Sequence, residues 1–325
     1  MIECLSQRAA FRLCLFFFAV SFGCSPNSTE PNPEPVPDYQ LGKNRYTTEV
    51  DGDTREYYVH VPTGYDAKTA TQVVFMLHGT TGDGERFYNI SGWKEVGEVE
   101  NILTVYPSSW HYCIIDNGVV KNTTKWHVYS GAFEYCADEN PRDDIKFLRQ
   151  VITELKQRFN VDDKRMYLAG FSNGGQMAGR CAVEMSDVFA AVVESAGTLP
   201  LDTTFTARRK LPVIFQLGNS DDKWTLSSSF DIPMALFDSL LTSQRVFQGI
   251  IHTHASTFGM ASTYTMSGDT SSVLIATFAA APASSSREFK FVLIKGLEHN
   301  YPNGSNHPLN GAEMNWAWMK QFTLP

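Results

Sequence analysis

The sequence MYLAGFSNGGQM, at residues 166–177, carries the clearest indication of the fold. The apolar run 166–169 leads directly into Gly170-Phe171-Ser172-Asn173-Gly174, which matches the pattern G-x-S-x-G. In this pattern the serine lies on a strained turn between a strand and a helix, and only small neighbours permit that turn. A flexible glycine-rich loop is the alternative interpretation. Because a buried strand precedes Ser172 and a helical pattern follows it, the context favours an exposed nucleophilic serine.

Short apolar runs bounded by loops recur on both sides of this stretch. Such runs are typical of a parallel sheet whose two faces are covered by helices. They lie at residues 73–77, 102–106, 166–169, 191–193, 211–215 and 289–294. Residues 57–61, after the turn at 51–53, are expected to form the second arm of a hairpin.

Helical spacing appears between these runs, at residues 145–159, after Ser172, and at 312–322. The sequence therefore predicts an α/β fold with a mostly parallel, doubly wound sheet and helices on both faces, in one domain from residue 41 to 325. Residues 225–287 are rich in Ser, Thr and Ala, and two alternatives stay open for them: a cap over the site, or additional strands and loops.

A serine hydroxyl becomes a nucleophile only when a base takes its proton, and a carboxylate must orient that base. The run 211–215 leads into Asp221, and the run 289–294 leads into His299. Ser172, Asp221 and His299 are therefore the predicted catalytic triad, in the chain order Ser, Asp, His. Asp222 is the alternative acid.

The tetrahedral intermediate of such a reaction needs two backbone N–H donors. One is expected from Asn173, which follows the nucleophile, and the other from Thr80 in the glycine-containing loop 78–84. Trp224, beside the proposed acid, is a candidate for the substrate pocket, with packing as the alternative. Trp110 and Tyr301 are further substrate-binding candidates.

The overall charge excludes some partners. The chain of 325 residues has 27 Lys and Arg against 35 Asp and Glu, a net charge of −8. Nucleic-acid recognition requires clustered basic residues, so we expect no nucleic-acid partner. His252 and His254 would share one face of a strand, as zinc ligands do, but no third ligand is evident nearby and no metal is predicted.

The N-terminal residues are interpreted as a targeting segment. Arg8 and Arg12 precede the apolar run 13–20, which is too short to span a bilayer and long enough for a signal-peptide core. Residues 1–23 are the predicted signal peptide. Residues 21–24 resemble a bacterial lipobox, so Cys24 is expected to be lipidated, with ordinary cleavage as the alternative. Residues 24–40 are rich in proline and are predicted to be a disordered tether.

The remaining cysteines fit an exported protein. Cys113 and Cys136 flank a polar, turn-rich segment, and a disulfide between them is expected. Cys181 lies on a predicted helix and is expected to be a buried thiol. We therefore expect an extracellular, outer-surface or periplasmic location, with membrane contact only through the lipid anchor.

The sequence resembles the polyhydroxybutyrate depolymerase, feruloyl esterase and acetyl-xylan esterase family. The resemblance rests on residues 77–79, 106–107, 160–177 and 188–192, and it covers most of residues 45–322. It implies an α/β-hydrolase fold and an extracellular serine esterase without metal or cofactor, acting on polyesters or on acyl groups of plant polysaccharides. The family's acid follows His-Gly-Thr, where this chain has Leu-Gly-Asn at 217–219, so the acid stays open between Asp221 and Asp222.

Three functions from different classes remain open. The first is a serine esterase that hydrolyses feruloyl, acetyl or polyhydroxyalkanoate esters through an acyl-enzyme. The second is a serine peptidase, which uses the same chemistry. The third is a non-catalytic polysaccharide-binding lipoprotein on a hydrolase scaffold.

Overall fold

The computed structural model describes residues 38–129, 131–224, 231–281 and 287–325. The predicted signal peptide, the lipidation candidate Cys24 and most of the predicted tether lie outside these residues. Residues 38–40 of the tether are described, and they contact the domain. The Tyr39 ring lies 5.2 Å from that of Phe159, and Asp38 pairs with Arg158 at 3.0 Å. None of the described helices is long and apolar enough to span a membrane.

Ten described strands form one sheet, in the order β1-β2-β4-β3-β8-β9-β10-β13-β12-β11. Neighbouring strands in its centre pair in parallel; they are β4 (Leu103–Pro107), β3 (Thr71–Leu77), β8 (Val161–Phe171), β9 (Ala191–Ser195), β10 (Val213–Gly218) and β13 (Glu288–Ile294). All residues of β4, β9 and β10 are buried, as expected for parallel strands covered on both faces.

Both edges of the sheet are antiparallel hairpins. One edge is formed by β1 (Gly42–Val50) and β2 (Asp53–Val61), joined by the turn that the sequence predicts. The other edge is formed by β12 (Val273–Ala280) and β11 (Met260–Gly268). The predicted mostly parallel sheet is confirmed, and the described part of residues 225–287 forms helices over residues 234–258 and then this second antiparallel edge.

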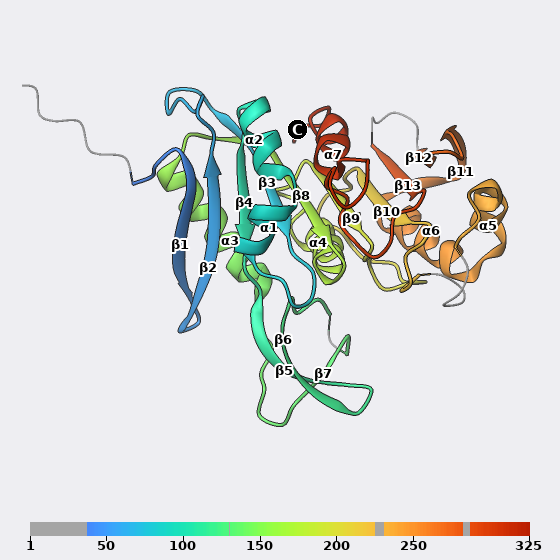
Figure 1. Ribbon diagram of the computed structural model, residues 1–325, viewed down its shortest axis with the longest axis horizontal. Coiled ribbons are helices and arrows are strands. Elements are labelled where there is room, and N and C mark those ends of the chain that lie inside the picture. Colours follow the sequence, from blue (N-terminus) through green and yellow to red (C-terminus); the bar gives the residue numbers. More distant parts are fainter. Residues whose placement is uncertain (1–37, 130, 225–230, 282–286) are drawn as a thin grey trace, which may run out of the picture. The chain divides into compact units, whose positions relative to one another are not determined.

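Helices cover both faces of the sheet (Figure 1). One face packs against α1 (Gly84–Ile90), α2 (Trp93–Glu100) and α7 (Gly311–Met319). The other packs against α3 (Asp144–Arg158), α4 (Asn173–Glu184), α5 (Phe237–Ser243) and α6 (Arg245–Phe258), and the 3₁₀ turn η1 (Met234–Leu236) leads into α5. Each face has its own hydrophobic cluster, as a doubly wound α/β fold requires.

The expectation of a strand at His252 and His254 is wrong, because both residues lie on α6. Residues two apart in a helix do not share a face. His252 is exposed, whereas His254 is fully buried, with its Nε2 3.2 Å from both carboxylate oxygens of Glu194 on β9. In the described residues, no group of three or more His, Cys, Asp or Glu side chains is arranged to hold a metal ion.

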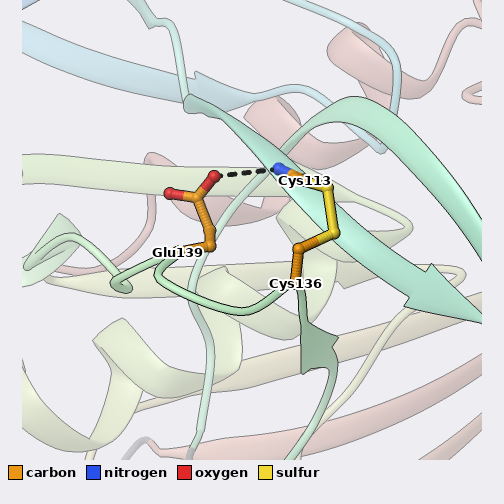
Figure 2. The surroundings of a disulfide bond; sticks show 3 residues. All are labelled: Cys113, Cys136 and Glu139. Atoms are coloured by element: carbon orange, nitrogen blue, oxygen red, sulfur yellow. Dashed lines mark hydrogen bonds between the residues drawn. A yellow bond between two sulfur atoms is a disulfide. The ribbon is translucent and has the colours of Figure 1, made fainter.

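A three-stranded lobe is inserted between β4 and α3. It consists of β5 (Trp110–Asp116), β6 (Val119–Lys125) and the short β7 (Glu134–Tyr135), and it projects away from the ten-stranded sheet (Figure 1). The predicted disulfide between Cys113 and Cys136 is confirmed. Figure 2 shows that Glu139, just beyond it, accepts a hydrogen bond of 3.0 Å from the Cys113 backbone N–H. The lobe is thus closed on itself at its base.

Candidate active site

Ser172 lies at the junction of β8 and α4, with φ 54° and ψ −121°. This strained conformation is the one that a sharp strand-to-helix turn needs. The turn is also crowded: a Cβ on Gly170 would lie 2.0 Å from the Gly174 carbonyl oxygen, and one on Gly174 would lie 2.4 Å from that of His78. The small residues of the G-x-S-x-G pattern are therefore required by close backbone packing.

The structure brings Ser172, Asp221 and His299 into one hydrogen-bonded chain. The His299 Nε2 lies 2.9 Å from the Ser172 hydroxyl, and its Nδ1 lies 2.9 and 3.0 Å from the two Asp221 oxygens. His299 follows β13 and Asp221 follows β10, next to one another in the sheet. An imidazole held in this way can accept the serine proton on Nε2 while its Nδ1–H donates to the carboxylate.

The two candidate acids differ completely in their surroundings. The Asp221 carboxylate is fully buried and also accepts a hydrogen bond of 2.9 Å from the Lys223 backbone N–H. The Asp222 side chain is 63% exposed and pairs with the Lys223 ammonium at 3.1 Å. Only Asp221 therefore has the position that a base-orienting carboxylate needs.

The backbone N–H groups of two residues are the predicted oxyanion donors. Thr80 and Asn173 both line the cavity that contains Ser172. Asn173 is the first residue of α4, so its N–H has no acceptor within the helix. Among the described residues, neither backbone N–H donates a hydrogen bond. Both donors are thus free to meet a substrate oxygen.

Buried polar groups fix the loop that carries Thr80. The His78 Nε2 accepts a hydrogen bond of 2.9 Å from the Ser109 backbone N–H, so its Nδ1 carries the proton and donates to the Gly79 carbonyl at 2.7 Å. Complete burial lowers the pKa of His78 to about 4, because a charged imidazolium would be desolvated there. His78 is therefore neutral at physiological pH.

The lobe braces the same loop from the other side. The Trp126 indole N–H donates to the His78 carbonyl at 2.9 Å, and the Thr124 carbonyl accepts from the Thr81 N–H at 3.1 Å. The Trp126 backbone N–H also donates to the Asn173 side chain at 2.7 Å. Residues that follow β5 in the chain thus hold both candidate oxyanion donors in position.

Of the candidate triad, Ser172 and His299 line a cavity of about 680 Å³, whereas Asp221 is buried behind His299. Trp224 and Tyr301 line it, as the sequence predicts, and the Tyr301 hydroxyl is held by the Trp93 indole N–H at 3.0 Å. Trp110 does not line it. Its ring packs under the guanidinium groups of Arg142 and Arg55, at 4.8 and 5.9 Å, so it belongs to the base of the lobe.

A second cavity of about 220 Å³ adjoins the first, and the two share Gln176 and Trp224 as lining residues. Its walls are mostly apolar, but two hydroxyl groups, of Tyr129 and Thr198, are buried there without a hydrogen-bond partner in the described residues. Buried hydroxyl groups of this kind are usually satisfied by a ligand or by water. The second cavity therefore offers two buried hydroxyl groups to a ligand or to water.

Several residues that line the main cavity were not predicted from the sequence. Phe171 and Gln176 flank the nucleophile within the quoted stretch, so their proximity to Ser172 was a usable signal. Arg86, Lys125 and Phe133 come from α1 and the lobe, and no local pattern marks them. The positions of Lys125 and Phe133 in the site depend on the fold of the lobe, and that of Arg86 on the packing of α1.

Comparisons with known proteins identify chains of similar sequence. Residues 127–223 match the prolyl oligopeptidase family. The chain is 27% identical over 243 residues to a protein named as an esterase, NocK from Nocardia uniformis subsp. tsuyamanensis, covering 69% of this chain and 63% of that protein. It is 24% identical over 171 residues to the bifunctional acetylxylan esterase/xylanase XynS20E from Neocallimastix patriciarum, covering 53% of this chain and 22% of that protein. The chain thus spans less than two thirds of these relatives.

A solved structure supports the fold. The acetyl xylan esterase from Aspergillus awamori superposes with a TM-score of 0.55 at 14% identity, over 85% of this chain and 99% of that one. Other sequence relatives are named feruloyl esterase and poly(3-hydroxyalkanoate) depolymerase. The resemblance inferred from the sequence is therefore confirmed: the chain has the α/β-hydrolase fold and is related in sequence to acetylxylan esterases, feruloyl esterases and poly(3-hydroxyalkanoate) depolymerases.

Proposed function

We propose that this protein is a serine esterase that hydrolyses carboxylic esters through an acyl-enzyme. The observation that carries the proposal is the hydrogen-bonded chain from Asp221 through His299 to Ser172, with distances of 2.9 to 3.0 Å, in an open cavity. A serine, a base and a buried acid in this order form the arrangement that activates a hydroxyl group for attack on a carbonyl.

In the proposed mechanism, Ser172 Oγ bonds to the ester carbonyl carbon while His299 Nε2 takes the hydroxyl proton. The carbonyl oxygen becomes an oxyanion, and the N–H groups of Thr80 and Asn173 stabilise it. The bond to the leaving alcohol then breaks, and His299 gives its proton to that alcohol. Water, deprotonated by His299, attacks the acyl-enzyme, releases the carboxylic acid and regenerates Ser172.

The proposed substrate is an acyl group carried on a polymer, such as acetyl or feruloyl esters of plant polysaccharide, or a polyhydroxyalkanoate ester. A relative acts, by its name, on acetylxylan. The main cavity is open and large enough for part of a chain, and the second cavity offers room for an acyl group larger than acetyl. For such substrates we propose an exported location. Product analysis on acetylated xylan, methyl ferulate and polyhydroxybutyrate, compared side by side, identifies the acyl group.

The esterase proposal is tested with 4-nitrophenyl acetate and a fluorophosphonate probe. Ser172→Ala is expected to lower kcat by about 10³-fold or more and to abolish labelling. Ser305→Ala, at an exposed serine outside the cavity, is the matched control and should keep both. A folded wild-type protein that neither hydrolyses the ester nor takes the label would refute the proposal, and binding to xylan would then test the non-catalytic alternative.

Peptide hydrolysis is a second candidate, because the prolyl oligopeptidase model matches residues 127–223. That segment contains Ser172, Asp221 and the strands between them, which both ester and peptide hydrolysis use. Peptide 4-nitroanilides distinguish the two activities. We expect ester turnover without measurable anilide turnover, and the reverse result would make the chain a peptidase.

A further inference from the structure

The charged side chains that line the main cavity are basic, although the protein as a whole is acidic. Arg86, Lys125 and Lys223 are among the described lining residues, and no Asp or Glu is. The whole chain, by contrast, has a net charge of −8. The cavity that contains Ser172 is therefore lined by basic groups in an otherwise acidic molecule.

Lys125 is the most informative of these groups because it is half-buried. Its ammonium lies 3.5 Å from the centre of the Phe133 ring, another cavity-lining residue. Within the described part of the chain, no carboxylate lies within ion-pair distance of it, and burial lowers its pKa. Asp116 acts on the Lys125 charge from beyond ion-pair distance without reversing this shift, so a bound anion would still relieve the desolvation penalty.

Arg86 adds a second cation from another element, the helix α1. Asp83 is close in sequence, but its carboxylate accepts the Arg86 backbone N–H at 2.7 Å. The Arg86 guanidinium has no ion pair with any carboxylate in the described residues. Lys223 contributes less net charge, since it pairs with Asp222 at 3.1 Å. Lys125 and Arg86 are thus the available cations.

We propose that this cavity selects esters that carry a carboxylate near the scissile bond, and that Lys125, with Arg86, binds that carboxylate. The proposal rests on the esterase function proposed above. A cleft with walls of low dielectric and one sign of charge concentrates ligands of the opposite charge. The carboxylate has two sources: the acyl part, as in a half-ester of a dicarboxylic acid, or the alcohol part, as in a sugar acid.

Two matched pairs of esters test both sources. The acyl pair is methyl hydrogen succinate and methyl butyrate, whose alkoxide leaving group is too poor for the succinate carboxylate to displace by itself. The alcohol pair is acetylated xylo-oligosaccharide with and without a glucuronic acid branch. The measured quantity is the ratio of kcat/KM for the anionic ester to that for the neutral ester, at low and high sodium chloride.

In one of the two pairs, Lys125→Gln is expected to lower the anionic-to-neutral ratio of kcat/KM about tenfold. Lys125→Arg, which keeps the positive charge, should preserve most of that ratio. The wild-type ratio should also fall with added salt. Lys156→Gln is the matched control, because Lys156 lies on α3, outside the cavity, and pairs with Asp163 at 2.8 Å. A change in the succinate pair assigns the carboxylate to the acyl part, and a change in the sugar pair assigns it to the alcohol part.

An unchanged ratio in both pairs for Lys125→Gln would overturn the proposal. That outcome remains distinct from failure of the esterase function itself. If the esterase function fails, wild type hydrolyses none of the four esters. If only the carboxylate site fails, the neutral esters are still hydrolysed and Ser172→Ala abolishes that turnover.

Discussion

Asp221 and Asp222 are adjacent and chemically identical, yet only Asp221 contacts His299. Asp221→Asn is expected to lower kcat/KM for 4-nitrophenyl acetate by about 10³- to 10⁴-fold, because the amide no longer stabilises the charged imidazole. Asp222→Asn should change kcat/KM by less than about twofold, since its carboxylate faces solvent. Equal losses in both variants would contradict the assignment of the acid.

His78 makes the stability of the protein depend on pH. Its pKa is about 4 in the folded protein against 6.5 ordinarily, so between these values the unfolded chain binds a proton that the folded chain does not. The free energy of unfolding therefore falls as the pH is lowered through this range, by about 2 kcal/mol from His78 between pH 7 and pH 5. Burial also lowers the pKa of His60 and His127, in the same direction.

Urea unfolding at pH 7 and pH 5 measures this dependence. His78→Gln, which keeps a polar group near the Ser109 N–H, should be less stable at pH 7 but lose about 2 kcal/mol less on acidification. His111→Asn, at an exposed histidine, is the control and should follow wild type. A wild-type slope in His78→Gln would show that His78 is not the group responsible.

At the scale of elements, the disulfide secures the lobe that braces the oxyanion loop. Reduction, or the double variant Cys113→Ser/Cys136→Ser, is expected to destabilise the lobe by about 3 kcal/mol through loop-closure entropy. Because Thr124 and Trp126 contact the loop of Thr80, kcat should fall as well. The measurement is kcat and Tm with and without dithiothreitol, and the double variant should show no further response to the reductant.

Glu194 and His254 connect the central strand β9 to α6, and both are fully buried. Glu194→Ala is expected to destabilise the fold by about 3 kcal/mol, because His254 loses its partner in a dry interior. Glu194→Gln retains a hydrogen-bond acceptor and should lose clearly less stability. Chemical unfolding of the two variants measures the difference, and equal losses would show that volume rather than the polar contact matters.

The sequence predicts those elements whose burial follows a simple rule. The central strands are apolar on both faces, so continuous runs such as 213–215 reveal them. Helix α6 does not follow this rule, because its buried face mixes aromatic residues with small and polar ones. The small and polar residues are Gly249, Thr253, His254 and Thr257. The lobe strands escape it because β6 is largely exposed and polar.

The residues of the candidate site likewise fall into those that the sequence predicts and those that it does not. Ser172 and its neighbours are marked by a local turn that requires small residues, and His299 follows the last central strand. The cavity walls carry no such mark, since Lys125 and Phe133 reach the site only through the folding of the lobe. Trp110, which its residue type favours as a wall, instead packs against Arg142.

At the scale of the whole molecule, the described residues from Asp38 to Pro325 belong to one compact unit. A chain that starts at Asp38 is expected to keep kcat/KM for 4-nitrophenyl acetate within about twofold of the full chain, because the triad and the cavity lie entirely within this unit. A chain that starts at Gly42 should melt several degrees lower, since it loses the Tyr39 ring contacts and the Asp38 ion pair. Equal melting temperatures would show that residues 38–41 add nothing to the fold.

The position of the lobe in the chain has a consequence for engineering. All of it falls between the end of β4 and the start of α3, whereas Ser172, Asp221 and His299 follow β8, β10 and β13. One continuous segment can therefore be exchanged for that of a relative without touching a strand that carries a triad residue. Such chimeras would replace one wall of the candidate substrate cavity in a single exchange. Each donor segment must contain residues that make the contacts of Thr124 and Trp126 with the loop of Thr80.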